Sequence, residues 1–201
     1  MDKSSSLNSL LVGEAMQAAA DACSSGMVAV VGLDKGTVDQ ICAEAREKSG
    51  AQVAIANYLV DGNYAVSGAN EACEAVKAIA PEKGARMAVS LAVAGAFHTD
   101  FMSPAVDTLK KVLDEVEIKE PRIPVFSNVD AKPHGSAAEI KEKLAMQVTQ
   151  PVQWETIITE MVKSPEWEAG EGNSYELGPG TVCRGIVKRF GKKQPVQSIQ
   201  V

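Results

Sequence analysis

Residues 53–68 read VAIANYLVDGNYAVSG, and this stretch decides the predicted fold. Both of its halves are rich in apolar and β-branched residues, which favour extended backbone. Asp61-Gly62-Asn63 lies between the two halves and is typical of a tight turn that joins neighbouring antiparallel strands. The stretch therefore predicts a β-hairpin, with strands over Val53–Val60 and Tyr64–Gly68.

The segments on either side of this hairpin complete a recognisable order of elements. They predict a strand over Met27–Leu33, a turn and N-cap over 34–37, a helix over Val38–Lys48, a helix over Glu71–Ile79 capped by Asn70, and a strand over Arg86–Ala94. The resulting order, β-α-β-β-α-β, is that of a ferredoxin-like sandwich with two helices on one face of a sheet. We therefore expect residues 27–94 to form a small ferredoxin-like subdomain in an α/β protein.

The rest of the chain has a mainly helical pattern. It predicts helices over Leu7–Cys23, Phe101–Val116, Ala137–Gln147, Val152–Val162 with Pro151 in its first turn, and Thr181–Phe190, and strands over Ile123–Asn128 and Tyr175–Leu177. The last strand leads through Gly178-Pro179-Gly180 into a helix, as at the edge of an α/β sheet. Because too few strands are present to complete such a sheet, we expect residues 95–201 to be part of a domain.

Composition excludes several classes of function. The chain is 45% apolar and 23% charged, as in ordinary globular proteins, and its net charge of −6 argues against a dedicated nucleic-acid binder. No apolar run reaches the ~20 residues of a membrane span, and the serine-rich start lacks the apolar core of a signal peptide. The four cysteines have no metal-type spacing, which predicts reduced thiols in an intracellular protein.

His98 is the strongest candidate for chemistry. It is one of only two histidines and lies where an apolar run gives way to a polar turn. Imidazole titrates near neutral pH, so a histidine at such a junction can transfer protons; a structural role in capping the helix after it is equally open. His134 lies in a turn-like loop, where we expect it to be solvated. Two histidines so placed do not predict a metal site.

A nucleophile for His98 is harder to find. Serine nucleophiles usually occur as Gly-x-Ser-x-Gly at a strained turn between a strand and a helix. The 201 residues contain no such motif, and the nearest candidate, Val66-Ser67-Gly68, falls inside a predicted strand. Gly178-Pro179-Gly180 is read as a helix-entry turn rather than a phosphate site. The acids Glu166, Glu168 and Glu171 around Trp167 are read as a surface loop.

Four ordered segments carry a family resemblance: Gly95–His98 (GAFH), Ile123–Asp130 (IPVFSNVD), Gln147–Trp154 (QVTQPVQW) and Glu176–Gly180 (ELGPG). Together they resemble the malonyl-CoA:acyl carrier protein transacylases, most closely the plastid type of plants and algae, from about Gly13 to Phe190. The resemblance implies an α/β-hydrolase-like large subdomain with an inserted ferredoxin-like one. Residues 1–26 would then be a divergent N-terminus and a helix of the large subdomain, and 95–201 its C-terminal part.

The resemblance also implies a ping-pong acyl transfer, in which a serine takes malonyl from coenzyme A and the phosphopantetheine thiol of acyl carrier protein takes it from the serine. His98 would be the base, oriented by the main-chain carbonyl of Gln147. Phe97, just before it, would favour malonyl, because its ring would crowd an α-methyl branch. The implied partners are malonyl-CoA and acyl carrier protein, with no cofactor, nucleic acid or membrane.

The chain departs from the family pattern at its start. The family's Gly-His-Ser-x-Gly and Gly-Gln-Gly segments lie upstream of the match to Gly13, and Val12 stands where the family has the arginine that pairs with the malonyl carboxylate. This sharp loss of similarity is typical of a splice variant, an incomplete gene model or a truncation. It predicts a polypeptide that is inactive alone, with apolar surface exposed around the helices after His98. The resemblance suggests a plastid location; the cytoplasm and the mitochondrion are the alternatives.

Two other functions compete with this one. Five cations and no acid lie between Thr181 and Val201, and Arg184, Lys188 and Lys192 recur at helical spacing. A non-catalytic module that docks the acidic acyl carrier protein is therefore the alternative, although ordinary solvated charge explains the pattern as well. A free-standing ferredoxin-like regulatory domain comes third, because it leaves the residues after His98 unexplained.

Overall fold

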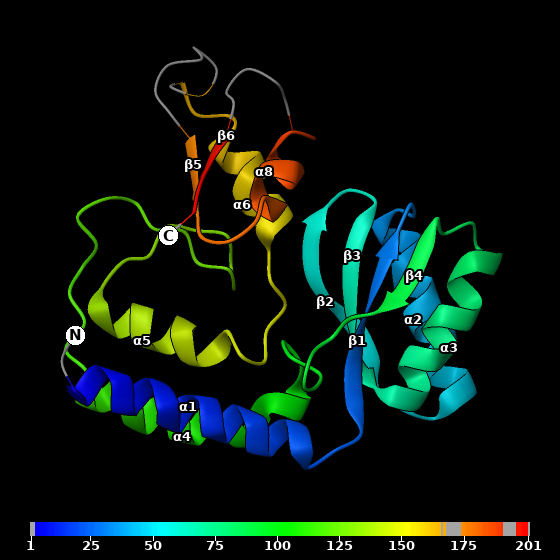
Figure 1. The fold of residues 1–201 in the computed structure, drawn as a ribbon, viewed down its shortest axis with the longest axis horizontal. Coiled ribbons are helices and arrows are strands. Elements are labelled where there is room, and N and C mark those ends of the chain that lie inside the picture. The colour runs from blue at the N-terminus through cyan, green and yellow to red at the C-terminus, as the bar shows by residue number, and fades with distance from the viewer. Residues whose placement is uncertain (1–2, 166, 168–173, 191–195, 201) are drawn as a thin grey trace.

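A computed structural model describes residues 3–165, 167, 174–190 and 196–200 of the protein (Figure 1). In chain order its elements are α1 (Lys3–Asp21), β1 (Ser25–Val31), α2 (Lys35–Ser49), β2 (Val53–Val60), β3 (Asn63–Ala69), α3 (Asn70–Glu82), β4 (Met87–Ser90), the 3-10 turn η1 (Asp100–Met102), α4 (Ser103–Glu115), α5 (Ala137–Met146), α6 (Trp154–Met161), β5 (Ser174–Leu177), α8 (Val182–Val187) and β6 (Val196–Ile199). The predicted β-α-β-β-α-β order is confirmed, as are the hairpin at Gly62 and the first helix.

Strands β1 to β4 form one antiparallel sheet in the order β2-β3-β1-β4. Helices α2 and α3 cover one face of this sheet (Figure 1). Val28 pairs with Val66 and Val30 with Tyr64, and all four side chains are buried in the core that the sheet shares with these helices. Apolar residues at alternate strand positions thus build this core, as the period of 2 requires.

The opposite face of the sheet carries smaller side chains, and it positions the site. Met27 and Ala65 lie on that face, with Ala56 on the neighbouring strand, and the ring of Phe97 packs against the cluster that these residues form. Ser67 is the cross-strand partner of Met27, so it points to the same face. The segment that follows β4 is thereby held against the sheet on the side away from α2 and α3.

Helices α1, α4 and α5 form a second group beside the sheet (Figure 1). Ala19 and Ala20 of α1 pack against Met102 and Ala105, where η1 runs into α4. Phe97 also packs against this cluster. The ring of Phe97 therefore joins the sheet to the helices that follow His98.

Two predicted strands differ from the structure. The strand expected over Arg86–Ala94 ends at Ser90, because past Leu91 the chain leaves β1 and crosses toward Ser67. The strand expected over Ile123–Asn128 is absent from the described residues. Phe126 forms only an isolated bridge to Pro133, whose missing N–H prevents a continuing ladder.

Two predicted helix starts also differ. Asn70 does not cap α3: the helix begins at Asn70 itself, and the side chain of this residue donates to the hydroxyl of Ser24 instead. Pro151 lies outside α6, which begins at Trp154. The residue after it, Val152, is extended against β2, where its carbonyl accepts from the N–H of Tyr58 at 2.9 Å. Because Val152 pairs with β2, α6 begins only at Trp154.

The C-terminal end holds a strand that the sequence patterns did not reveal. β6 pairs with β5 in parallel, and the helix between them ends at Val187 rather than Phe190. Of the three cations expected on one face of this helix, Arg184 lies in α8, Lys188 is its C-cap, and Lys192 lies outside the described residues. Among the described residues, no helix has the length and apolar character needed to cross a membrane.

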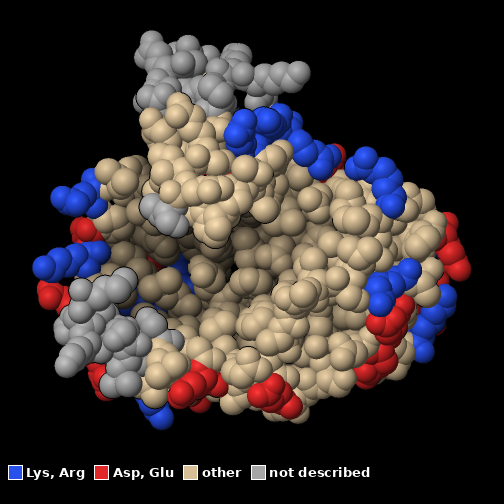
Figure 2. Space-filling model, in the orientation of Figure 1, with Lys and Arg blue, Asp and Glu red and all other residues tan. Residues whose placement is uncertain are grey.

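Large apolar side chains are exposed after β4, in the loop before α5 and on the β5–β6 pair: Leu91, Val93, Ile123, Val125, Leu177 and Ile199. Figure 2 shows a face that is hollowed near its middle, with most charged side chains around the rim. A two-stranded parallel sheet normally belongs to a larger sheet covered on both faces. Exposed apolar side chains grouped in this way favour association with another protein surface.

We predict that a polypeptide of these 201 residues self-associates in a concentration-dependent manner. Light scattering coupled to gel filtration measures this directly. Because Ile123 and Leu177 are each 72% exposed, the double variant Ile123→Ser, Leu177→Ser should associate less without losing fold. A wild-type chain that stays monodisperse and monomeric at all concentrations contradicts the prediction.

Candidate active site

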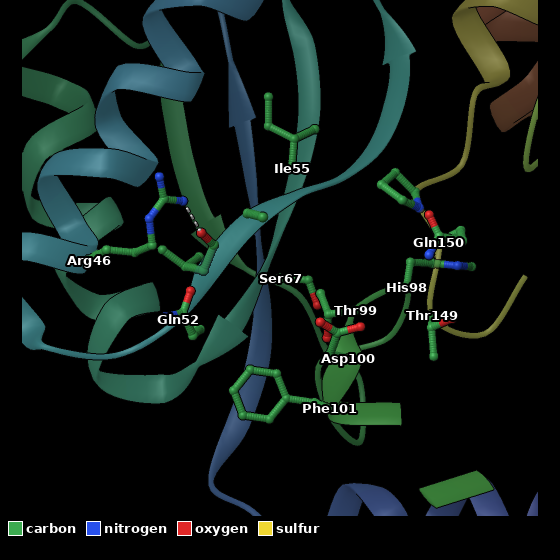
Figure 3. A pocket seen from close by; sticks show the side chains of 13 residues that line it. Arg46, Gln52, Ile55, Ser67, His98, Thr99, Asp100, Phe101, Thr149 and Gln150 are labelled. Atoms are coloured by element: carbon green, nitrogen blue, oxygen red, sulfur yellow. Dashed lines mark hydrogen bonds between the residues drawn. The ribbon is translucent and has the colours of Figure 1, made fainter. Parts of the chain in front are cut away.

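A cavity of about 560 Å³ lies between the sheet and the segment that follows it (Figure 3). Its walls come from the end of α2, from β2 and β3, from the His98 turn and from the segment before α6. The lining residues are Arg46, Gln52, Val53, Ala54, Ile55, Ser67, His98, Thr99, Asp100, Phe101, Thr149, Gln150 and Pro151. His98 is thus placed at a cavity wall, as a residue that performs chemistry must be.

The imidazole of His98 has one firm contact. Its Nδ1 lies 2.8 Å from the main-chain oxygen of Gln147. A carbonyl oxygen can only accept, so in the neutral ring Nδ1 carries the hydrogen and Nε2 carries the lone pair. Gln147 follows the last turn of α5, so the end of a helix fixes the direction of the ring. A carbonyl here does what a carboxylate does in a Ser-His-Asp triad: it selects the tautomer and orients the base.

The backbone at His98 is strained. Its φ is 61°, in the left-handed region that non-glycine residues seldom occupy. Such a conformation costs on the order of 1–3 kcal/mol and persists only where the surroundings fix it. Here the N–H of His98 donates to the carbonyl of Val148 at 3.0 Å. Gly95, three residues earlier, lies so close to α1 that a Cβ would stand 2.8 Å from that of Ala20, so only glycine fits.

Three hydroxyl side chains share the cavity with His98, and each one donates to a main-chain carbonyl. Ser67 donates to Phe97 at 2.8 Å, Thr99 to Ala96 at 2.6 Å and Thr149 to Met146 at 3.2 Å. Their hydrogens are therefore engaged by the backbone rather than by the imidazole. None of the three is arranged as the nucleophile of a serine–histidine pair.

Phe97 lies beside His98 but does not line the same cavity. Its ring packs on the sheet against Met27 and on α1 and η1 against Ala20 and Met102. The ring is held from two sides.

The other predicted residues lie apart from this cavity. His134 is half-buried rather than solvated. Its main-chain N–H donates to the carbonyl of Val125, and the Nδ1 atom of its ring is buried. The helix-entry turn at Gly178–Gly180 is confirmed, with φ of 135° and 95° at its two glycines. The carboxylate of Glu176 accepts from the N–H groups of Cys183 and Arg184 at the start of α8, and these bonds hold its pKa below the usual range.

The remaining predictions concern the cysteines, the acids around Trp167 and metal binding. The free cysteines are Cys23, Cys42, Cys73 and Cys183, and burial raises the pKa of Cys42 to about 12. The acids Glu166, Glu168 and Glu171 lie outside the described residues. No group of histidine, cysteine or carboxylate side chains that could hold a metal occurs in the described part of the chain.

Sequence reasoning missed the support of the site. The second anchor, the carbonyl of Val148, is a backbone group with no signal of its own. The sequence offers Ser67 only as a candidate nucleophile, and its position opposite Met27 follows from the register between β1 and β3. Arg46, which lines the cavity and donates to the carbonyl of Val53 at 2.7 Å, gave no sequence signal.

One ion-pair cluster ties α5, and with it Gln147, to the preceding loop. The ammonium of Lys143 lies 2.8 Å from the carboxylate of Asp130 and 2.5 Å from that of Glu139. Partial burial tends to raise the pKa of Asp130, but hydrogen bonds from Lys143 and from the backbone of Lys132, together with the charge of Lys143, outweigh it and lower that pKa. The same lysine lowers the pKa of Glu139.

A carboxyl whose pKa is lower in the folded state stabilises the fold above its ordinary pKa of about 4, and this contribution is lost as the pH falls through that range. We predict that Lys143→Met lowers the urea midpoint at pH 7 and that the difference from wild type shrinks by pH 3. Lys119→Met, at a fully solvated pair, is the control. An equal difference at both pH values would exclude the ion pairs as its source.

Comparison with known proteins places this geometry in context. No family model matches the chain. The malonyl CoA-acyl carrier protein transacylase of Bacillus subtilis is 36% identical over 181 residues, 90% of this chain and 55% of that protein. The mitochondrial human protein of that name is 34% identical over 183 residues, 87% of this chain and 46% of that protein. The chain thus spans about half the length of the curated relatives it matches.

Solved structures agree with the sequence relatives. An acyl-carrier-protein S-malonyltransferase of Burkholderia pseudomallei superposes with a TM-score of 0.84 at 32% identity, over 94% of this chain and 59% of that one. A malonyl-transacylase solved in complex with a type II PKS acyl-carrier protein gives the same TM-score at 33% identity, over 94% and 59%. By sequence and by fold, this α/β chain belongs to the malonyl-CoA:acyl carrier protein transacylase family.

Proposed function

We propose that this chain carries the base of a malonyl-CoA:acyl carrier protein transacylase, which moves malonyl from coenzyme A to the phosphopantetheine thiol of acyl carrier protein for fatty acid synthesis. One observation carries the proposal: the 2.8 Å contact between Nδ1 of His98 and the carbonyl of Gln147, which leaves Nε2 as a free base at a cavity wall. The similarity to transacylases of that name over nine-tenths of the chain supports it.

In the proposed reaction, Nε2 of His98 takes the proton of a serine hydroxyl as the serine oxygen attacks the malonyl thioester carbonyl. The imidazolium then gives that proton to the departing coenzyme A thiolate. In the second half, Nε2 deprotonates the phosphopantetheine thiol, which attacks the malonyl ester, and returns the proton to the serine. The serine belongs to the part of the family fold that these 201 residues do not span. No cofactor takes part.

The carbonyl of Gln147 would stabilise the imidazolium in both halves without taking a proton itself. It already accepts from Nδ1 in the neutral form, and this bond strengthens when the ring becomes charged. The side chain of Gln147 is used differently: its oxygen accepts from the amide of Asn128 at 3.5 Å. Both contacts fix the end of α5 beside the His98 turn.

Phe97 is proposed as the residue that favours malonyl over branched acyl groups. Its place next to His98 in the chain and the family resemblance support this role; the ring itself packs on the sheet and on α1 and does not line the cavity of His98.

The fold supports the family arrangement of subdomains. The strand order β2-β3-β1-β4 with both helices on one face fits a ferredoxin-like subdomain over 27–94. The parallel β5–β6 pair with α6 and α8 fits a part of an α/β-hydrolase-like subdomain within 95–201, to which residues 1–26 add α1. An intracellular compartment, the plastid by the resemblance, is the location we propose.

Acyl carrier protein is the proposed partner, since a structural relative was solved in complex with one. The alternative of a purely docking module has less support. Arg184 and Lys188 do not line the cavity of His98. Their charge does not mark a docking face beside the site.

A chimera tests the proposal. The aligned residues of this chain replace the matching 181-residue part of the Bacillus subtilis relative, which supplies the remainder of the fold. With malonyl-CoA and holo acyl carrier protein, the expected result is malonyl-acyl carrier protein, identified by its mass. A chimera that unfolds cooperatively like its parent but transfers no malonyl contradicts the proposal.

A further inference from the structure

Ser67 of β3 is a fully buried polar side chain that the proposed chemistry does not use. It is 0% exposed, and its hydroxyl donates to the main-chain oxygen of Phe97 at 2.8 Å. It stands on the free face of the sheet and lines the cavity that contains His98 (Figure 3). A hydroxyl in such a place is costly to bury unless its bond serves the fold or the site.

The bond acts on one particular peptide unit. The Phe97–His98 peptide has two polar groups: its C=O accepts from Ser67, and its N–H donates to the carbonyl of Val148 at 3.0 Å. One end is therefore held by the sheet and the other by the segment after α5. With this peptide plane fixed at both ends, the φ of 61° at His98 is determined by its surroundings, although the residue does not favour it.

The neighbouring hydroxyls do not duplicate this bond. Ser25 accepts from the N–H of Ala96, and Thr99 donates to the carbonyl of Ala96. Both act on the residue two positions before His98. Among the side chains that the structure describes, only Ser67 donates to the carbonyl of Phe97.

We propose that Ser67 is a positioning residue that keeps His98 in the tautomer with Nδ1–H on Gln147 and Nε2 free. Its hydroxyl fixes the Phe97 carbonyl, this carbonyl fixes the peptide plane, and the plane sets the direction in which the imidazole leaves the backbone. The relevance of this tautomer to catalysis rests on the proposed function; the positioning of the ring does not.

Nitrogen-15 NMR of the imidazole in the 201-residue chain tests this directly, because the shifts of Nδ1 and Nε2 report which nitrogen carries the hydrogen. In wild type, His98 should show one tautomer, with Nδ1 protonated. Ser67→Ala leaves the Phe97 carbonyl without its donor, and we expect the population of the other tautomer to rise roughly tenfold. Ser67→Thr, which keeps the hydroxyl, should restore the wild-type spectrum.

The matched control is Ser49→Ala, which removes a hydroxyl-to-carbonyl bond of 2.6 Å at the end of α2. It should leave the His98 shifts unchanged. If Ser67→Ala does not fold, Ser67→Cys replaces it, because cysteine is nearly isosteric with serine and its thiol is a weaker donor. We expect Ser67→Cys to raise the population of the other tautomer as well, but by less. Wild-type shifts in Ser67→Ala or Ser67→Cys overturn the positioning role. Because no malonyl is transferred in this measurement, an inactive chimera would remove the proposed function and leave the tautomer result standing.

Discussion

Replacing His98 with alanine in the chimera is expected to reduce malonyl transfer by about four to six orders of magnitude. In the proposed mechanism both half-reactions use His98 as their base, and this variant removes it. The side chain lies at the cavity wall, where its Nδ1 contacts the carbonyl of Gln147. No other histidine is among the described residues that line this cavity. The measurement is the steady-state rate of malonyl-acyl carrier protein formation.

His134→Ala is the matched control, because it removes the second histidine of the chain from a loop that does not line the cavity. Its rate should stay within about twofold of the parent chimera, as is usual for substitutions away from a site. A His98→Ala chimera that keeps a tenth or more of the parent rate would show that another group is the base.

A polypeptide of the 201 residues alone is expected to transfer malonyl at no more than the background rate, again about six orders of magnitude below the chimera. The structure gives the reason: Ser67, Thr99 and Thr149 share the cavity with His98, but each donates its hydrogen to the backbone. A base without a nucleophile forms no acyl-enzyme.

The same assay, run at equal concentrations of polypeptide and chimera, measures this difference. The His98→Ala variant of the polypeptide sets the background. Transfer by the polypeptide that is well above this background, and that depends on His98, would show that the described residues contain a nucleophile after all.

Much of the sheet could be predicted from the sequence because its signals are local. Alternation of apolar residues and the Asp61-Gly62-Asn63 turn depend on neighbours in the chain, so the hairpin and the strands around it were found. Elements that depend on distant partners were not. β6 is only four residues long and exists through its pairing with β5, and Val152 stays extended because β2 lies beside it.

In the site, too, some features have a local signal in the sequence and others do not. His98 stands out because histidine is rare in this chain and lies at a junction, and the resemblance implied Gln147 as its partner. The structure brings these two residues, 49 positions apart, to 2.8 Å. The left-handed backbone of His98 and the hydroxyl of Ser67 on Phe97 carry no local signal, because they follow from how the turn packs between the sheet and α5.

The exposure of apolar residues is a third property of the structure that could not be predicted from the sequence. Periodicity identifies the apolar side of a helix or strand but not whether another element covers it. The loop residues Ile123 and Val125 and the strand residue Leu177 are as apolar as core residues, yet they are exposed in the structure. Burial of such residues depends on elements distant in sequence, which periodicity does not report.

The most direct test of the central claim, that His98 is the base for malonyl transfer, is a rapid-quench measurement on the chimera. Malonyl-CoA is mixed with the enzyme in the absence of acyl carrier protein, and the released coenzyme A is counted per enzyme. We predict a burst of about one coenzyme A per chimera with His98 and none on the same timescale with His98→Ala, since the base is needed to form the acyl-enzyme. An equal burst in both proteins would contradict the account.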